Sequence, residues 1–341
     1  MTIDFKNLNL NELKSQNSFE EKILSFIKEW FSSSPSVKVQ TSGSTGTPKI
    51  FEVEKSKMLN SARMTCDFIG LKEADSALIC LPIEYISGKM MVVRSIERKL
   101  NLYVKEPSTK PLGNLSEIIT FCAMTPLQVE NSLDKIYLIK NLIIGGASVS
   151  NSLKVKISQT LKHFNPSTKV YETYGMSETL SHIALKEIYP KEEEYFTTFD
   201  SVEISQDERN CLKIYAPQLN SEVLQTNDIV ELKNHKQFKF LGRADNIINS
   251  GGAKIYPEEI ENLVKREIPN EVVAIGIPDE KLGQKLFLIV ESKESEDLKS
   301  QILNIQFPKS FQKPKGIIFV DKIPRTHNGK VNRLELIKSI L

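Results

Sequence analysis

The sequence predicts an α/β protein with a body built on a mainly parallel sheet with helices, a small antiparallel subdomain, and a small α+β lobe at the C-terminus. Short apolar runs alternate with helix-like segments in the first half of the chain, a pattern typical of βα units. Residues 202–240 change to short strands separated by turns, and helix and strand signals begin again after residue 243. The length of 341 residues suits two domains, since a domain usually holds about 100 to 200 residues.

The first elements flank a loop rich in hydroxyl groups. Residues 19–31 carry apolar side chains at helical spacing, so we expect a helix packed on the core. Strands are expected at Val37–Gln40 and Lys49–Val53, on either side of the loop. Ser56 is suited to cap a helix that ends near Gly70, because serine accepts from helix N–H groups and glycine tolerates the closing conformation.

Apolar runs of strand length predict the main sheet. They lie at Ala77–Pro82, Leu102–Val104, Thr120–Met124, Leu142–Ile144 and Lys169–Glu172. Helix-like segments at Pro126–Leu133 and Val149–His163 separate some of these runs. Because parallel strands need long crossover connections, this alternation favours a parallel sheet.

The rest of the chain predicts antiparallel strands and then a second domain. The expected antiparallel strands are Cys211–Tyr215, Asp228–Leu232 and Lys236–Leu241. A helix is expected from Pro257, because a proline followed by two acids suits a first helical turn. Further strands are expected at Val272–Ile277, Leu286–Glu291 and Ile317–Val320. We therefore expect an N-terminal domain over residues 1–244 and a C-terminal lid domain over residues 245–341.

Composition argues against several classes of protein. Lys and Arg number 45 against 43 Asp and Glu, a net charge of +2 that is too balanced for a nucleic-acid surface. The longest apolar run, near residues 77–83, is too short to span a bilayer, and the N-terminus lacks a secretory leader pattern. The four cysteines and four histidines are scattered, so neither a zinc site nor a disulfide framework is indicated. We expect a cytoplasmic protein without stable membrane insertion, whose oligomeric state stays open.

The loop between the first two expected strands is suited to bind an oligophosphate. Residues 41–47 hold five hydroxyl groups and two glycines, and a proline and a lysine follow them. Converging backbone N–H groups, hydroxyls and an ammonium group are the donors that phosphates need. The loop is not a Walker A motif, because Pro48 intervenes before Lys49 and a strand follows.

Five further motifs follow this loop in order. They are Tyr171–Thr179, Thr226–Asp228, Leu241–Asp245, Ser250–Glu261 and Pro324–Arg333. Their order and spacing resemble the adenylate-forming superfamily of acyl-CoA synthetases, peptide-synthetase adenylation domains and luciferases. The resemblance runs from about Thr41 to Arg333. It implies a fold with a truncated adenylate-forming N-terminal domain and a small mobile C-terminal domain, and an AMP-forming acid–thiol ligase that uses ATP, Mg²⁺ and coenzyme A.

Within the superfamily, the chain most resembles the short o-succinylbenzoate–CoA ligases of menaquinone biosynthesis. The segments that carry this resemblance are FCAMTPLQVENSL, YETYGMSETLSHIAL and GRADNIINSGGAKIYPEEIE. Two features depart from the superfamily pattern. The first motif begins at Thr41, whereas it normally lies well over a hundred residues into the chain, so most of the usual first subdomain is missing. Asn227 stands where a glycine is common before the ribose-binding aspartate.

The resemblance implies a nucleotide site. The residues expected to hold the β- and γ-phosphates are Thr41, Ser42, Gly43, Ser44, Thr45, Gly46 and Lys49. Tyr174, followed by Gly175, would stack on adenine. Gly146 and Ala147 would line the base pocket, although a glycine pair after a strand is also typical of a tight turn.

Four more residues complete this nucleotide site by resemblance. Ser177 would contact the α-phosphate, and Glu178 would hold Mg²⁺, a cation that commonly binds one or two carboxylates together with substrate phosphates. Asp228 would accept from both ribose hydroxyls. Arg243 would bind ribose or phosphate through its fork of donors.

The implied reaction has two half-steps that different parts of the C-terminal domain serve. Lys330 would bridge carboxylate and phosphate oxygens during adenylation and is the expected catalytic residue. Asp245 matches the superfamily's hinge. Rotation about it would bring the loop of Ser250, Gly251 and Gly252 to the site, where the two glycines would let the pantetheine arm of CoA pass close to the backbone.

The substrate pocket is expected around Tyr85, Ser87, Gly88 and His182. Tyr85 occupies the place of the aromatic residue that gates the carboxylate pocket in the superfamily. An o-succinylbenzoate has a second carboxylate, whose partner is expected among Arg94, Lys89, Ser181 and His182; the sequence does not rank these four. Ordinary packing of His182 is an equal alternative.

Two other functions stay open at this point. A ligase for another aryl or small carboxylic acid, or one that loads a carrier-protein thiol, would use the same motifs. A non-catalytic adenylate-binding regulatory protein is the alternative from another class, motivated by the missing first subdomain. The presence of Lys330, Glu178 and Asp228 together argues against it.

Overall fold

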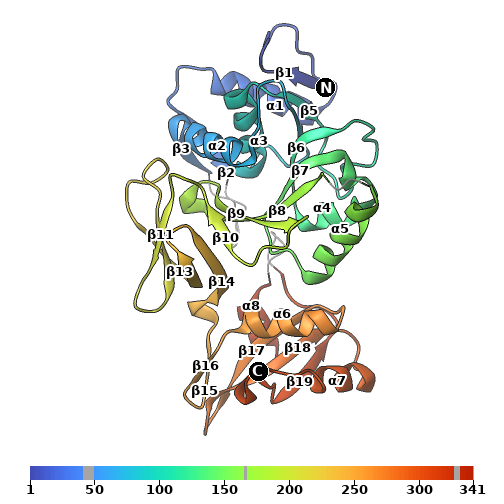
Figure 1. The fold of residues 1–341 in the computed structure, drawn as a ribbon, viewed down its shortest axis with the longest axis vertical. Coiled ribbons are helices and arrows are strands. Elements are labelled where there is room, and N and C mark those ends of the chain that lie inside the picture. Colours follow the sequence, from blue (N-terminus) through green and yellow to red (C-terminus); the bar gives the residue numbers. More distant parts are fainter. Residues whose placement is uncertain (41–49, 165–166, 326–330, 341) are drawn as a thin grey trace.

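The computed structural model describes residues 1–40, 50–164, 167–325 and 331–340. Figure 1 shows an elongated molecule, with a larger body that carries the N-terminus and a smaller lobe that carries the C-terminus. Among the described residues, a 12-stranded sheet forms the centre of the body and a 5-stranded sheet forms the centre of the lobe. The mixed α/β fold expected from the sequence is confirmed.

Parallel strands make up the first part of the large sheet. They are β4 (Ser76–Ile79), β5 (Asn101–Val104), β6 (Ile119–Met124), β7 (Ile139–Ile144) and β8 (Lys169–Gly175). At one edge, β1 (Thr2–Asp4) pairs antiparallel with β5. The five strands lie at the apolar runs from which they were predicted.

Helices cover both faces of these strands. On one face lie α1 (Ser18–Trp30), α2 (Lys55–Ile69) and α3 (Ile86–Arg98), and on the other α4 (Pro126–Asn131), the 3₁₀ helix η1 (Leu133–Leu138) and α5 (Asn151–Phe164). Ala77 and Ile79 of β4 belong to the first apolar cluster, and Leu78 belongs to the second. Both faces of the strands are therefore buried, as is usual for parallel sheets.

The antiparallel strands continue the same sheet. After β8 the order is β9 (His182–Tyr189), β10 (Phe196–Thr198), β14 (Gln237–Arg243), β13 (Leu224–Asn234), β12 (Cys211–Tyr215) and β11 (Glu203–Gln206). The strands expected from residues 211–241 are present. They are hydrogen-bonded to the parallel part through β9 and β10, because a short connection folds β9 back antiparallel onto β8.

The C-terminal lobe begins just after β14. Its strands are β15 (Ile248–Ser250), β16 (Ala253–Ile255), β17 (Val272–Asp279), β18 (Gly283–Glu291) and β19 (Gly316–Val320). Its helices are α6 (Pro257–Glu267), α7 (Glu296–Leu303), η4 (Ser310–Gln312) and α8 (Arg333–Ile340), and α6 contacts both β14 and α5 of the body. The chain leaves the large sheet at Arg243 and enters the small one at Ile248. The division into domains at residues 244 and 245 stays a prediction.

Two local expectations need correction. Ser56 is not the cap of α2: the helix begins at Lys55, with Glu54 at the cap position, and Ser56 lies inside the first turn. Gly70 does close this helix, with a φ of 77°. Helix α3 was not predicted; every residue from Gly88 to Ser95 is buried, including Lys89 and Arg94, so the charged residues of this stretch do not mark a solvent-exposed face.

Candidate active site

The expected phosphate loop and the expected catalytic lysine fall on residues that the structure does not describe. Thr41, Ser42, Gly43, Ser44, Thr45, Gly46, Lys49 and Lys330 lie outside the described residues. The flanking strands β2 (Ser36–Gln40) and β3 (Ile50–Glu54) are present and pair antiparallel, with Gln40 opposite Ile50. A bridge between Gln40 and Tyr85 connects this pair to the start of α3.

Asp228 is the centre of the expected ribose site. It is a buried residue of β13, and its Cα pairs with that of Arg243 on β14. Its Oδ1 accepts from Arg243 Nη1 at 3.0 Å, and its Oδ2 accepts from the hydroxyl of Tyr174 at 2.5 Å. Burial, together with the charge of Asp228, raises the pKa of Tyr174, so this phenol stays protonated and donates. The structure thus brings together three residues predicted for the nucleotide site.

The ring of Tyr174 is held by other aromatic side chains. The ring of Phe238 lies edge-on at a centroid distance of 4.8 Å, and those of Phe196 and Phe240 are tilted at 5.8 and 6.5 Å. These contacts orient a flat surface beside the Asp228 carboxylate. Stacking of this ring on adenine remains a prediction.

Asp245 lies in the short 3₁₀ helix η3 (Ala244–Asn246), between the two sheets. Its Oδ2 accepts from Arg243 Nη2 at 2.8 Å, and its Oδ1 accepts from the amide of Asn227 at 3.2 Å. Arg243 therefore joins Asp245 to Asp228, and the bond to Asp245 raises the pKa of Arg243. Arg209 Nη1 donates in turn to the side-chain oxygen of Asn227. Asn227, the residue that departs from the superfamily pattern, thus donates a hydrogen bond to Asp245, the expected hinge.

The turn after β8 presents the Ser177 and Glu178 side chains. Gly175 ends the strand, and both following residues lie in the 3₁₀ helix η2 (Ser177–Thr179), where they are exposed. A side chain at Gly175 is excluded, because a Cβ there would lie 2.4 Å from the Cα of His182. The Glu178 carboxylate has no hydrogen bond or ion pair to another described residue, so it is free to bind a cation.

The expected base pocket lies at the end of β7. Gly146 has a φ of 86° and both Gly146 and Ala147 are exposed, which agrees with a turn at this place as well as with a lining role. The nearby Glu172 accepts from the backbone N–H of Val149 at 3.0 Å and pairs with Lys186 at 3.0 Å. Burial opposes ionisation of Glu172, but the two lysines Lys186 and Lys154 outweigh it and lower the pKa of this carboxyl group.

The expected gate of the acyl pocket forms the start of α3. Tyr85 is the N-cap residue and half-buried, and Ser87 is exposed. Gly88 is packed against the preceding turn so closely that a Cβ would lie 2.2 Å from the carbonyl oxygen of Pro82. Gly88 therefore has a packing role whether or not substrate passes it.

Three of the four candidates for the second carboxylate come together. Arg94 of α3 is 2% exposed, and its Nη2 donates to the hydroxyl of Ser181 at 3.0 Å. That hydroxyl is 3.3 Å from Nδ1 of the buried His182. Lys89 lies elsewhere, with its ammonium group 4.2 Å from the ring centroid of Phe26.

Arg94 is not neutralised within the described part of the chain. No acidic group pairs with it there, its Nε has no hydrogen-bond partner, and Nη1 reaches only the Met91 sulfur at 3.8 Å. Burial lowers the pKa of Arg94 to about 10, so the group is still a cation at neutral pH. Burial and the charge of Arg94 lower the pKa of His182, which is therefore neutral.

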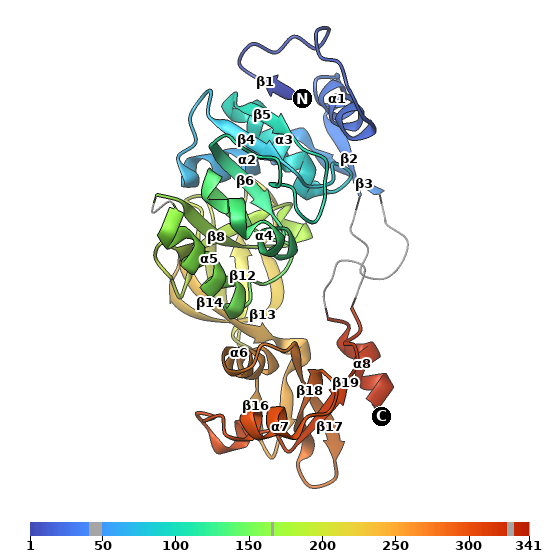
Figure 2. The ribbon, with the colours of Figure 1, turned by 90° about the vertical axis from the view of Figure 1, so that its right-hand side faces the viewer.

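The loop expected to serve CoA lies apart from the expected nucleotide site. Ser250, Gly251 and Gly252 belong to the β15–β16 hairpin, and Figure 1 shows that hairpin at the lower end of the molecule, below α6. Figure 2 shows the same separation from a second direction. The structure therefore does not bring the expected CoA loop together with Tyr174 and Asp228.

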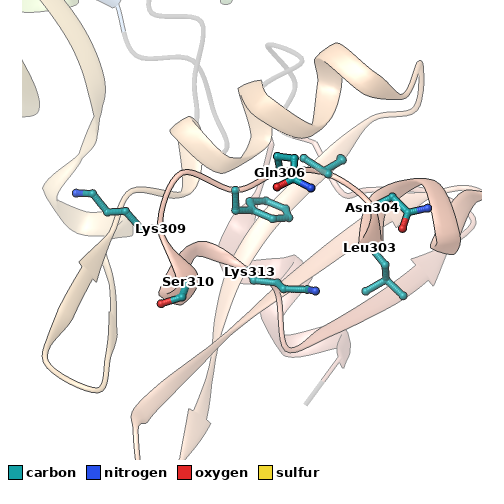
Figure 3. Close-up of a pocket in the computed structure, with 8 residues that line it drawn as sticks. Leu303, Asn304, Gln306, Lys309, Ser310 and Lys313 are labelled. Atoms are coloured by element: carbon teal, nitrogen blue, oxygen red, sulfur yellow. The ribbon is translucent and has the colours of Figure 1, made fainter.

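A surface groove on the lobe contributes no predicted site residue. It has a volume of about 260 Å³ and lies between α7 and η4, where Figure 3 shows Lys309 and Lys313 pointing in different directions.

Within the described ranges, no group of three or more His, Cys, Asp or Glu side chains is placed to hold a metal ion. Nor does any described helix combine the length and apolar character needed to cross a bilayer.

Known proteins resemble the chain along most of its length. The family model "AMP-binding enzyme" matches residues 11–202, and "AMP-binding enzyme C-terminal domain" matches residues 256–330. A solved acyl-CoA synthetase (AMP-forming)/AMP-acid ligase II-like protein from Dyadobacter fermentans DSM 18053 is 32% identical, with a TM-score of 0.67. That match covers 100% of this chain and 99% of the other.

Two more similar proteins have names that refer to o-succinylbenzoate. A 2-succinylbenzoate–CoA ligase of Lactococcus lactis subsp. lactis strain IL1403 is 26% identical, over 87% of this chain and 70% of the relative. The o-succinylbenzoate CoA synthetase (MenE) from Bacillus subtilis, solved with ATP and magnesium ion, has a TM-score of 0.71 at 21% identity. It covers 88% of this chain and 69% of that protein, and at this identity it supports the fold alone.

Proposed function

This chain belongs to the AMP-binding enzyme family, and from that premise we propose that it is an ATP-dependent acid–CoA ligase whose favoured acid is o-succinylbenzoate. In the first half-reaction, the acid's carboxylate attacks the α-phosphorus of ATP and expels pyrophosphate, which leaves an acyl-adenylate. In the second, the thiol of CoA attacks the acyl carbonyl and AMP leaves. The place of this ligase would be the menaquinone pathway.

The geometry around Asp228 supports the nucleotide half of this proposal. Its ionised carboxylate would accept from the ribose hydroxyls, and Arg243 and Tyr174 hold it in a fixed orientation. Ser177 and Glu178 lie exposed just beyond the end of the same β8 strand that carries Tyr174, so one element would serve adenine and phosphate together. Preorganised groups of this kind lower a barrier because they need not reorient during the reaction.

Glu178 fits a magnesium site shared with the nucleotide. Mg²⁺ usually takes one or two carboxylates and completes its shell with phosphates and water, so a single exposed carboxylate is a suitable donor set. When bound, the ion would offset the charge of the ATP phosphates. The structural support is that the described residues leave this carboxylate unpaired.

The buried guanidinium of Arg94 is the observation that carries the choice of acid. A buried charge is costly unless it is paired, and an arginine fork matches a carboxylate particularly well. Arg94 is buried, charged and without an acidic partner in the described residues. A substrate with two carboxylates would present one to ATP and the other to Arg94, as o-succinylbenzoate can.

ATP–pyrophosphate exchange with a panel of acids tests the proposal. We expect exchange with o-succinylbenzoate to exceed exchange with 4-oxo-4-phenylbutanoate, which lacks the ring carboxylate, by at least about tenfold, because the second acid leaves Arg94 unpaired. Strong exchange with simple benzoates and none with o-succinylbenzoate would remove the substrate assignment. A lack of exchange with every acid would favour a non-catalytic adenylate-binding protein. Transfer of the acyl group to a carrier-protein thiol in preference to CoA would show that the acyl acceptor is a carrier protein.

A further inference from the structure

A chain of hydrogen-bonded polar groups, all buried except the half-buried Ser181, runs from α2 to Arg94. Thr65 Oγ1 lies 3.0 Å from Nε2 of His182 and 3.1 Å from the carbonyl oxygen of Ser61, one helical turn earlier. On the other side of the imidazole, Nδ1 lies 3.3 Å from the hydroxyl of Ser181, which accepts from Arg94 at 3.0 Å. The chain thus joins α2, β9 and α3, three elements far apart in the sequence.

The direction of each bond follows from what each group can donate. A guanidinium has only N–H donors, so Ser181 must accept from Arg94, and its own proton is left to donate to Nδ1 of His182. At the other end, a carbonyl oxygen only accepts, so the Thr65 hydroxyl donates to Ser61 and accepts from Nε2–H. Each proton on the two hydroxyls and on the imidazole ring nitrogen then has an acceptor.

The other neutral tautomer of His182, with its proton on Nδ1, does not satisfy all of these hydrogen bonds. If His182 carried its proton on Nδ1, both that N–H and Arg94 would donate to Ser181, whose hydroxyl proton would have no acceptor in the chain. Thr65 would then have to choose between Nε2 and the Ser61 carbonyl. Because Thr65, His182 and Arg94 are buried and Ser181 is half-buried, an unmatched donor or acceptor among them is costly.

We infer that Thr65 and His182 are positioning residues for the acid: they fix the Ser181 hydroxyl as an acceptor and so hold the Arg94 guanidinium in one orientation. The inference rests on the proposed role of Arg94 toward the second carboxylate. Neither Thr65 nor His182 needs to touch the substrate. Their contribution is to restrict a long, flexible cation to one geometry before the acid arrives, which lowers the cost of binding.

Substitution of Thr65 tests the positioning role. Thr65→Val keeps the shape of the side chain and removes its hydroxyl, whereas Thr65→Ser keeps the hydroxyl. We expect Thr65→Val to raise KM for the acid about three- to tenfold, the value of one hydrogen bond, with KM for ATP unchanged. Thr65→Ser should restore the parental KM for the acid. Equal changes of both KM values, or no change in either, would overturn the inference.

The state of the histidine gives a second test that needs no substrate. In the protein labelled with ¹⁵N-histidine, two-bond ¹H–¹⁵N spectra should show His182 as a neutral ring with its proton on Nε2, the signal being identified by its loss in His182→Gln. A ring protonated on Nδ1, or on both nitrogens, would overturn the inference even if the choice of acid is right. If another acid proves to be the substrate, the same Thr65 variants measured with that acid still decide whether Thr65 and His182 position Arg94.

Discussion

Two buried charges in this protein have opposite surroundings. Asp228 is satisfied from within the chain, since Arg243 and Tyr174 each donate to one of its oxygens. Arg94 is satisfied only in part, by the hydroxyl of Ser181. A charge that the fold already pairs can be rigid before substrate binds, whereas a charge that the fold leaves unpaired gains free energy when an anion reaches it. This contrast is the residue-level basis for assigning Asp228 to the nucleotide and Arg94 to the acid.

The chemical step is expected to depend on a third charged residue. Lys330→Ala should slow acyl-adenylate formation by about 10²- to 10³-fold, because one preorganised cation toward the reacting oxygens is lost. Transfer from a presynthesised acyl-adenylate to CoA should stay within about a factor of three, since that half-step does not use the lysine in the proposed mechanism. The two halves are measured separately, by pyrophosphate release and by thioester formation.

Lys322→Ala provides the matched control, because Lys322 is an exposed lysine of the same lobe. It should leave both half-reactions unchanged. An equal fall of both halves in Lys330→Ala would contradict the assigned division of labour.

At the scale of elements, the β8–β9 pair and its turn contribute several of the expected site residues. Tyr174 and the turn with Glu178 come from the end of β8, and His182 begins β9. The register is tied by a buried ion pair between Glu172 of β8 and Lys186 of β9, with Lys154 of α5 also within 3.5 Å of the carboxylate. The same cluster therefore joins the sheet to the helix behind the expected base pocket.

The Glu172 cluster predicts a pH-dependent contribution to stability. Its folded-state pKa is lowered below 4.5, so its contribution is present above about pH 4.5 and is lost as the pH falls through the folded-state pKa, where the carboxylate must take up a proton. Glu172→Gln should cost about 3 kcal/mol at pH 7, because the half-buried Lys154 and Lys186 lose their buried partner. The difference in Tm from the parent should then shrink below about pH 4.5.

Thermal unfolding between pH 3 and 8 measures this effect. Glu130→Gln, in the exposed pair with Lys156, serves as the control and should change the free energy of unfolding by less than about 1 kcal/mol. A Glu172→Gln variant that tracks the parent at a constant offset down to pH 3 would show that Glu172 has no such role.

For the whole molecule, the segment between β14 and β15 decides how body and lobe work together. Residues 244–247 join the two sheets, and Asp245 within them is held by Arg243 and Asn227. The β15–β16 hairpin, the expected CoA loop, lies at the end of the molecule away from the large sheet (Figure 1). In the proposed reaction the lobe must therefore turn between the two half-steps, and the bonds to Asp245 would have to break or re-form as it does.

A proline at the hinge tests this requirement. Proline fixes φ near about −65° and removes an N–H, so Asp245→Pro should hold one lobe orientation. Pyrophosphate release in the first turnover should continue, while thioester formation falls by about tenfold or more. Asp245→Ala removes the same carboxylate contacts without fixing φ and should keep both half-reactions within a few-fold of the parent.

Thermal unfolding must accompany both Asp245 variants, because a proline in structured backbone can also destabilise the fold. If Asp245→Pro is as stable as the parent and makes thioester at the parental rate, Asp245 is not the hinge.

The sequence by itself predicted much of the architecture that the structure shows, and its resemblance to a superfamily supplied a list of site residues that stays a prediction. Apolar runs located β4 to β8 because strands buried on both faces are continuous apolar stretches, and turn residues bounded the antiparallel strands. The ordered motifs identified Asp228, Arg243 and Tyr174 as members of one site, which the structure then joined by hydrogen bonds. The strands follow from local residue types and the site residues follow from the resemblance of the ordered motifs, so neither prediction required the packing to be known.

Only the tertiary structure decided which residues from distant segments contact one another. It separated Lys89 from Arg94, which sequence could not rank, because cation–π packing on α1 and hydrogen bonding to β9 are contacts between distant segments. It also revealed α3, in which the charged residues Lys89 and Arg94 are buried and so do not mark an exposed face, and it brought Thr65 into the chain that holds Arg94. These features depend on which surfaces meet when the chain folds, and burial turns an ordinary arginine or threonine into a residue whose every hydrogen bond has a free-energy consequence.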